Sequence, residues 1–589
     1  MIFPTINFAA FFLVVLAVSW LLMPRPRYWK PFILAASYFF YGYADARFVL
    51  LLATSTLVNQ AAAVALARRP EPVPRPGRRR FTARSAIVAA AVTADLGLLG
   101  WFKYYGFFAL SVDRALGNLG LGAPLPLLQV ALPIGISFFT FQALSYVIDV
   151  WRGDTRPARL IDFAVYEAFF PHLVAGPIVR AREFIPQLAS PRDRTAVPAT
   201  RAVFLICGGL VKKVVLADLL ARRLVDPVFT IPGQHSSVEV LVAVYGYAVQ
   251  IYCDFSAYSD IAIGVALLLG FRFPENFDRP YAATSLQDFW RRWHLTLSRW
   301  LRDYVYIPLG GSRRGRRRTQ LNLMLTMVLG GLWHGAAWTF VCWGALHGAG
   351  LATERTLDRR RARRRAPGHA SAPASLATIP LPRAGHEPRD LVPLGPPGLT
   401  SVVDAAGAAD GVPATDHVPA TDRVPATDGL SATVGGPTAV SDGPAASPVA
   451  PVRPREGSSG GSVTGPAADG DGAARHPRAW RWARRLLTFH LVCGAWVLFR
   501  SPDLATAGEI LRRLGTGGLA TGLVTPTVVA AIAVGLGLAA VPGRWWVAAQ
   551  GLFDRLPLAA QIGGVAVFLL VMYAAVGQQD VAPFIYFRF

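Results

Sequence analysis

Long apolar runs recur along most of this 589-residue sequence. A helix needs roughly 20 mostly apolar residues to cross the hydrocarbon core of a bilayer, and hydrophobic residues make up 53% of the chain. Charged residues make up 16%, against about 25% in ordinary soluble domains. The sequence therefore predicts an all-α, polytopic integral membrane protein with about eleven transmembrane or half-spanning helices. These runs begin near Phe8, Leu50, Ala86, Leu132, Phe163, Val203, Val238, Leu321, Leu486, Pro526 and Leu558.

One segment interrupts this membrane body. Residues 366–478 are rich in Pro, Ala, Gly, Ser, Thr and Asp, and they contain the related hexamers VPATDH, VPATDR and VPATDG from Val412 onward. This composition is typical of disorder. We expect residues 1–365 to form a membrane core, 366–478 a disordered cytoplasmic insertion, and 479–589 the transmembrane helices that complete the core.

The net charge of +23 comes from 59 Lys and Arg against 36 Asp and Glu. In a membrane protein such an excess belongs in cytoplasmic loops, so we expect a multi-pass protein of the cell membrane in contact with lipids. No nucleic-acid-binding motif accompanies the charge, and nucleic acid is not an expected partner. The four cysteines are widely spaced in apolar stretches, which predicts buried hydrophobes and no metal site. Residues 1–23 lack a basic start and a cleavage site and predict a retained first span.

Acids and amides occur within one apolar run, QIYCDFSAYSDIAIG. Gln250, Asp254 and Tyr258 are spaced four apart, so a helix stacks them on one face, and Asp260 follows. Acids at membrane depth are costly and are candidates for function. They are therefore candidates for a functional polar site; the alternative is that the two aspartates make structural hydrogen bonds between helices.

The next stretch, ending in LQDFWRRWHLTLSRWLRDYVYIPLGG, is too charged for a lipid-facing span. Arg forks match the geometry of phosphates, so this surface could bind the phosphates of coenzyme A or phosphopantetheine. The candidate donor-binding residues are Arg291, Arg292, Arg299 and Arg302. Headgroup binding and the setting of topology are the alternative, and they explain the following cluster at 313–318 better.

Two histidines are the candidate catalytic residues. His334 lies among small and apolar residues, next to Trp333 and to the glycines Gly330, Gly331 and Gly335. A neutral imidazole can act as a general base at physiological pH, and the glycines permit a helix break or a close approach of substrate. His294 could orient a donor or relay a proton. For each histidine the alternative is a buried ring held by structural hydrogen bonds. His347 ranks lower, because a continuous helix would place it on another face than His334.

Basic clusters at 313–318 and 359–365 flank the run that contains His334. If both flanks are cytoplasmic, the run must enter and return, with a break near Gly330–Gly335 and His334 at the bend. A single span is the other possibility, and the sequence leaves the choice open.

Several motifs resemble the membrane-bound O-acyltransferase family, in particular its alginate O-acetyltransferase branch. The resemblance covers almost everything outside residues 366–478. The motifs are ASYFFYGYAD, LPIGISFFTFQALSYVIDVWRG, FFPHLVAGPIVR, GLVKKVVLAD, QIYCDFSAYSDIAIG, PENFDRPYAATSLQDFWRRWHLTLSRWLRDYVYIPLGGSRRG and GLWHGAAWTFVCWGALHG. The family's invariant histidine falls on His334, and its second characteristic histidine falls on His294.

The resemblance implies helices around a central tunnel that is open to a cytosolic acyl thioester such as acetyl-CoA, with no bound cofactor. The residues expected to line this tunnel are Gln250, Asp254, Tyr258, Asp260 and Trp333. It also implies an exported polysaccharide as acceptor and, in this branch, a possible extracytoplasmic partner of the SGNH-hydrolase type. The resulting hypothesis is O-acyl transfer with His334 as general base. The alternative is a transporter or channel for an acyl carrier or glycan, without catalysis.

Three positions depart from the family pattern. His172 stands where the family has glutamine, Ala257 replaces a glycine, and Cys253 replaces an aromatic residue. None of these departures removes the candidate catalytic histidines.

Overall fold

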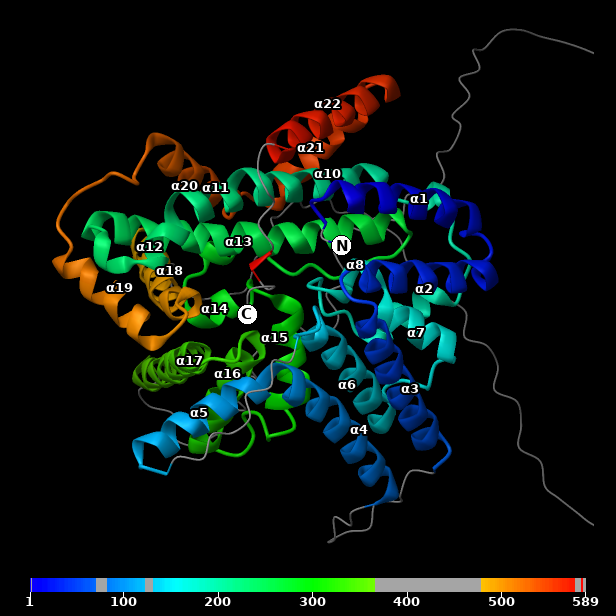
Figure 1. Ribbon diagram of the computed structural model, residues 1–589, viewed down its shortest axis with the longest axis horizontal. Coiled ribbons are helices and arrows are strands. Elements are labelled where there is room, and N and C mark those ends of the chain that lie inside the picture. The colour runs from blue at the N-terminus through cyan, green and yellow to red at the C-terminus, as the bar shows by residue number, and fades with distance from the viewer. Residues whose placement is uncertain (2, 70–81, 122–130, 366–477, 578–583, 586–589) are drawn as a thin grey trace, which may run out of the picture. The chain divides into compact units, whose positions relative to one another are not determined.

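The computed structural model describes residues 1, 3–69, 82–121, 131–365, 478–577 and 584–585, and every regular element among them is a helix (Figure 1). The all-α prediction is confirmed for this part of the chain. The predicted insertion lies outside the described residues, apart from Arg478, at which α18 begins.

The first half of the chain contains long helices and, from α7 onward, short ones. They are α1 (Ile6–Leu22), α2 (Pro26–Gly42), α3 (Arg47–Ala67), α4 (Ala83–Leu99), α5 (Tyr105–Asn118), α6 (Ile136–Arg152), α7 (Leu160–Ala168), α8 (Phe170–Leu173), α9 (Ala181–Phe184), α10 (Ala199–Leu210), α11 (Asp218–Leu220) and α12 (Asp226–Thr230). A π-helical segment, Gly100–Tyr104, joins α4 to α5, and two more, Val211–Ala217 and Ala221–Val225, flank α11. Such π segments are rare and often lie at functional sites.

The second half begins with an α-helix of 32 residues. Its helices are α13 (Ser237–Leu268), α14 (Leu286–Trp290), α15 (Leu295–Leu301), α16 (Arg316–His334), α17 (Trp338–Arg365), α18 (Arg478–Arg500), α19 (Leu504–Thr516), α20 (Pro526–Leu538), α21 (Gly543–Asp554) and α22 (Leu558–Gly577). A π segment, Arg302–Tyr306, follows α15.

Helix α13 runs through the middle of the described core, with α10 on one side and α14 and α15 on the other (Figure 1). A capping box between Ser236 and Glu239 starts it. Its N-terminal half packs into one hydrophobic cluster with α18 and α20, and its C-terminal half packs into another with α6 and α7. Because α13 is buried nearly all round, it joins the two clusters instead of facing lipid.

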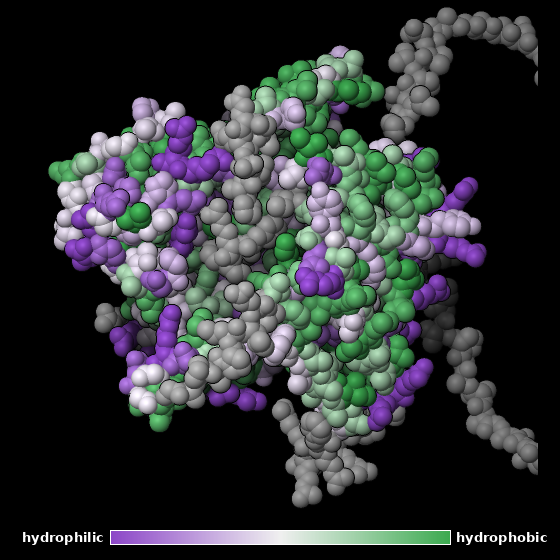
Figure 2. All heavy atoms as spheres, viewed as in Figure 1, coloured by the Kyte–Doolittle hydropathy of each residue, from purple (hydrophilic) through white to green (hydrophobic). Residues whose placement is uncertain are grey.

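Within the described ranges, three helices are long and apolar enough to cross a membrane: α3, the continuous helix Ala83–Asn118, and α13. Helices α20 and α21 are bent by 93° and would make a fourth span if taken as one. Large hydrophobic side chains such as Leu13, Leu21 and Leu50 are 66–72% exposed, which suits a lipid-facing surface. Figure 2 shows hydrophobic surface over α1, α2 and α22 and hydrophilic surface over α19. A multi-pass membrane protein is consistent with these observations, while the count of about eleven segments and the central tunnel remain predictions.

The span predicted to begin near Phe163 is wrong. Helix α7 ends at Ala168, and α8 and irregular backbone follow as far as Arg180, all of it buried in protein. Gly176 explains part of the break, because a Cβ there would lie 2.5 Å from the Cα of His172. Irregular backbone at membrane depth is tolerated where protein surrounds it.

Helices α16 and α17 form an antiparallel hairpin, which is the bent arrangement expected if the run enters and returns. The break spans Gly335–Ala337, directly after His334. Two glycines let the arms approach backbone to backbone: a Cβ at Gly331 would lie 2.2 Å from the carbonyl oxygen of Phe340, and one at Gly344 would lie 2.4 Å from that of Met327. The basic ends of both arms therefore lie at the same end of the hairpin.

Candidate functional site

His334 is the last residue of α16, at the turn of the hairpin, and it is 3% exposed. Its ring centroid lies 4.9 Å from that of Trp333, 5.3 Å from that of Trp343 and 5.2 Å from that of Phe499. The aromatic rings come from both arms of the hairpin and from α18. They exclude bulk water from the imidazole, which strengthens any electrostatic interaction made there.

His294 is fully buried and precedes α15 in a left-handed conformation, with φ of 45°. Non-glycine residues adopt this conformation rarely, and it is often found at functional positions. Its Nδ1 lies 3.1 Å from Oδ1 of Asn276. The same oxygen accepts from the backbone N–H and the hydroxyl of Thr296, at 3.3 and 3.0 Å.

This network assigns the tautomer of His294. The backbone N–H of Thr296 can only donate, so the side-chain atom of Asn276 that faces it is the carbonyl oxygen. Nδ1 of His294 must then carry its hydrogen in order to donate to that oxygen. In the neutral ring Nε2 is left with a lone pair, and it has no hydrogen-bond partner within the described part of the chain.

The structure brings the two candidate catalytic histidines together. Their ring centroids lie 6.2 Å apart, and Trp333 contacts both rings. Trp333 belongs to one hydrophobic cluster and Trp343 to the other, so the pair lies where the two clusters meet.

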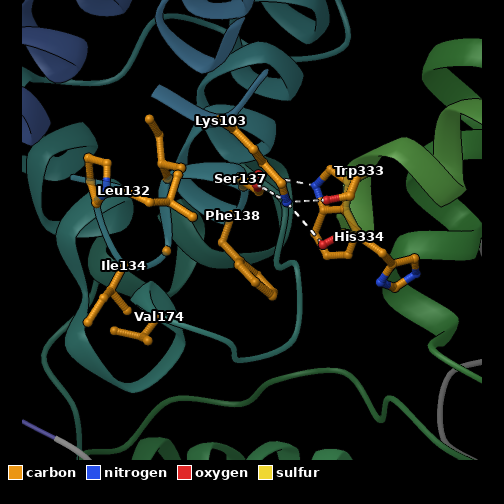
Figure 3. Close-up of a pocket in the computed structure, with 11 residues that line it drawn as sticks. Lys103, Leu132, Ile134, Ser137, Phe138, Val174, Trp333 and His334 are labelled. Atoms are coloured by element: carbon orange, nitrogen blue, oxygen red, sulfur yellow. Dashed lines mark hydrogen bonds between the residues drawn. The ribbon is translucent and has the colours of Figure 1, made fainter. Parts of the chain in front are cut away.

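A cavity of about 110 Å³ adjoins His334 (Figure 3). Its lining is mainly apolar and comes from the π segment after α4, the start of α6, the turn after α8 and the end of α16. The lining residues are Lys103, Leu132, Pro133, Ile134, Gly135, Ile136, Ser137, Phe138, Val174, Trp333 and His334. In Figure 3 the imidazole of His334 points away from Leu132, Ile134 and Val174, while its carbonyl oxygen faces Lys103.

Sequence reasoning missed Lys103 and misplaced His347. Lys103 lies in an apolar run, and an intramembrane lysine was a signal that could have been used. His347 was ranked low because a continuous helix was assumed, but the hairpin turns the chain back. Trp343 contacts both rings, with centroids 5.3 Å from His334 and 4.8 Å from His347.

The four candidate donor-binding arginines fall into two groups. Arg292 binds Asp288, with Nε 2.8 Å from Oδ1, and Arg291 precedes it at the end of α14. Arg302 lies elsewhere and donates from Nη2 to Oδ2 of Asp303 at 3.0 Å. Arg299 is on α15, one turn before Arg302.

Arg180 joins the second group, because its Nη1 lies 2.8 Å from Oδ2 of Asp303. Arg152 also reaches this point and donates to the Asp303 carbonyl oxygen at 3.2 Å. Burial favours the neutral form of the Asp303 carboxyl, but hydrogen bonds from Arg302 and the charge of Arg180 outweigh it and hold its pKa below the usual value. More arginines than acids converge there, which suits binding of a phosphate.

The candidate tunnel residues on α13 have other neighbours. Oδ1 of Asp254 lies 2.7 Å from Nζ of Lys213, and its Oδ2 accepts from the backbone N–H of Ile585 at 2.7 Å. Asp260 pairs with Lys212. The ring of Tyr258 stacks on Phe3 at 4.5 Å. Gln250 is 7% exposed, and its Oε1 has no partner among the described residues.

Trp333 differs from the tunnel candidates on α13, because its ring contacts those of His294 and His334. Its Nε1 donates to the carbonyl oxygen of Ser137 at 3.4 Å.

His172 is fully buried in an aromatic cluster apart from the histidine pair. Its Nε2 lies 2.8 Å from the carbonyl oxygen of Tyr166, and its ring contacts Phe184 and Phe273. His172 therefore has a packing role in the segment that follows α7, where the helix is interrupted.

A model of the membrane-bound O-acyltransferase family matches residues 154–371, a range that includes His294, His334 and the four candidate donor-binding arginines. The probable alginate O-acetylase of Azotobacter vinelandii is 42% identical over 361 residues, which is 61% of this chain and 69% of that protein. The peptidoglycan O-acetyltransferase of Helicobacter pylori is 35% identical, over 56% of this chain and 65% of its own length. The teichoic acid D-alanyltransferase of Streptococcus thermophilus is 32% identical, over 37% and 55%. All three relatives are named as enzymes that transfer an acyl group.

Proposed function

Because the chain belongs to the membrane-bound O-acyltransferase family and is therefore a multi-pass membrane enzyme that transfers acyl groups to oxygen, we propose that it transfers acetyl from a cytosolic thioester to a hydroxyl of an exported polysaccharide. His334 is the general base, and His294 assists it. The observation that carries this proposal is the pair of buried imidazoles at the turn of the α16–α17 hairpin, with centroids 6.2 Å apart.

The proposed reaction balances at the imidazole of His334. The acceptor oxygen attacks the carbonyl carbon of the thioester while His334 takes the hydroxyl proton. The C–S bond then breaks, and the imidazolium returns the proton to the leaving thiolate. His294 presents a lone pair on Nε2, which stabilises the neighbouring imidazolium. Proton transfer of this kind contributes about 10²–10⁴-fold to the rate.

The donor is an acyl thioester, and acetyl-CoA is the species we propose. Support comes from the convergence of Arg180, Arg299 and Arg302 around Asp303, since guanidinium groups bind phosphates in a fork.

The acceptor is proposed from the relatives. Their names specify alginate, peptidoglycan and teichoic acid, which are all polymers of the cell exterior. We therefore propose an exported polysaccharide as the acceptor for this chain. An extracytoplasmic acetyltransferase of the SGNH-hydrolase type is a candidate partner that would complete the transfer.

Radiolabelled acetyl-CoA tests this function in inverted membrane vesicles that contain the protein. Label is expected to appear on a macromolecule, and enzymatic digestion of that product would identify the acceptor. Label that never leaves the donor, in vesicles supplied with polysaccharide, would contradict acetyl transfer from coenzyme A. An acyl carrier protein tested in parallel separates a wrong donor from a wrong reaction.

A further inference from the structure

The π segment Gly100–Tyr104 reaches the helix end that carries His334, although 230 residues separate them (Figure 3). Nζ of Lys103 lies 2.6 Å from the carbonyl oxygen of Trp333 and 3.1 Å from that of His334. The hydroxyl of Tyr104 donates to the carbonyl oxygen of Leu332 at 2.7 Å. Two neighbouring side chains thus bind the last three carbonyls of α16.

A helix leaves its last four carbonyl oxygens without partners inside the helix. His334 and Gly335 are buried at the turn of this hairpin, and an unsatisfied buried carbonyl is costly. A cation at a helix C-terminus also interacts favourably with the negative end of the helix dipole. Lys103 and Tyr104 therefore supply the hydrogen-bond donors, and Lys103 the positive charge, that the C-terminal end of α16 needs beside His334.

Both side chains project from the π segment Gly100–Tyr104, the one stretch of the continuous helix Ala83–Asn118 with π geometry. Segments of this kind are often found at functional sites.

We propose that Lys103 and Tyr104 are positioning residues that hold the backbone of His334 in its working orientation. Lys103 is not a catalytic residue in this account, because its nitrogen is already bound to three oxygens: the two carbonyls and Oγ of Ser137 at 3.3 Å. This leaves it no proton with which to bind a substrate. The inference rests on the proposed function only where its test measures kcat for acetyl transfer; the hydrogen-exchange measurement does not depend on that function.

The same helix offers a matched control. Arg84, near the start of α4, donates to the carbonyl oxygens of Leu66 and Arg69 at 2.8 Å and of Trp151 at 3.0 Å. It is also a cation that binds carbonyls where helices end, here α3 and α6. The variant Arg84→Met loses a comparable contact that does not involve His334.

The experiment compares Lys103→Met with Arg84→Met in two measurements. Hydrogen exchange of the amides at 331–340 is expected to quicken in Lys103→Met and to stay as in wild type in Arg84→Met. The kcat for acetyl transfer is expected to fall about 10²-fold in Lys103→Met, as small misplacements of reacting groups do, with KM for acetyl-CoA nearly unchanged. Tyr104→Phe, which removes one hydroxyl only, is expected to show smaller changes in the same direction.

Unchanged exchange at 331–340 in both Lys103→Met and Tyr104→Phe would overturn the proposal, whether or not acetyl transfer is detected. Equal loss of kcat in Lys103→Met and Arg84→Met would also overturn it, because the effect would then be a general loss of stability. If Lys103→Met fails to fold, Tyr104→Phe alone decides through exchange. Absence of transfer by wild type would count against the proposed function and leave the exchange result standing.

Discussion

Two groups of buried polar side chains in this protein are satisfied to different degrees. Lys213 lies 2.8 Å from Asp218 and 2.7 Å from Asp254, and these side chains are only 1–4% exposed. Both oxygens of Asp254 are bound, one to Lys213 and one to the amide of Ile585. In the other group, one nitrogen of His294 is bound to Asn276, and its Nε2 has no hydrogen-bond partner in the described ranges.

We propose that this difference separates a packing role from a chemical one. The lysine cluster pairs opposite charges and ties the 584–585 segment to α13, so its groups are already engaged. The histidine pair keeps a lone pair available in a water-poor site. Asp254 and His334 were candidates in the sequence for the same reason, a polar residue in an apolar run. Substitutions at the histidines should therefore lower the rate of acetyl transfer, whereas substitutions in the lysine cluster should lower the stability of the fold.

The largest effect is expected at the histidines. His334→Ala should lower kcat by about 10²–10⁴-fold, because the proton-accepting group is lost. His294→Ala should also lose activity, and the double variant should be little worse than His334→Ala, since groups that act as a unit are not additive. Initial rates of acetyl transfer, normalised to folded protein, measure this. Losses that simply multiply would show that the two rings act independently.

The next effect concerns Asn276, which fixes the tautomer of His294. Asn276→Leu removes the acceptor for Nδ1–H and should lower kcat by about 10–10²-fold. Asn276→Asp keeps an acceptor there and should retain more activity. The matched control is Asn59→Leu, which removes a buried asparagine on α3 that binds Asp95 at 2.9 Å. If Asn276→Leu and Asn276→Asp lose equal activity, the tautomer argument fails.

The lysine cluster should respond in stability and not in rate. Lys213→Met leaves two buried carboxylates facing each other, and removal of one partner from a buried ion pair costs about 3–5 kcal/mol in the free energy of unfolding. Thermal unfolding in detergent measures that loss. The kcat of the molecules that remain folded should stay near wild type. A parallel fall in kcat would instead support the predicted role of Asp254 in a substrate tunnel.

The smallest effect is expected from the predicted insertion. Removing residues 366–477, so that α18 keeps its first residue, should leave acetyl transfer near the wild-type rate, because the histidine pair and the arginine groups lie outside that segment. Label transfer by the shortened protein measures this. A loss of activity with a normal amount of folded protein would show that the segment serves the reaction or recruits a partner.

Structural features that depend on neighbouring residues in the sequence were easier to predict than features that depend on distant residues. Glycines beside His334 and basic clusters on both flanks made a bend one of two possibilities, and the structure has the bend. The span near Phe163 failed because hydropathy does not register a backbone broken by Gly176 and buried in protein. Lys103 was missed because its partners are more than 200 positions away, so no periodicity links them. The contacts of Trp343 with His334 and His347 could not be predicted for a related reason. The position of the helix break decides which residues face His334.

The most direct test makes the same substitution at two buried histidines. His334→Gln and His172→Gln each replace a buried imidazole with an amide, one at the turn of the hairpin and one in the aromatic cluster around Phe184 and Phe273. Initial rates of label transfer from acetyl-CoA, per folded molecule, are compared with wild type. The account predicts that His334→Gln loses at least about 10²-fold while His172→Gln stays close to wild type. Activity retained by His334→Gln, or an equal loss in both variants, would contradict it.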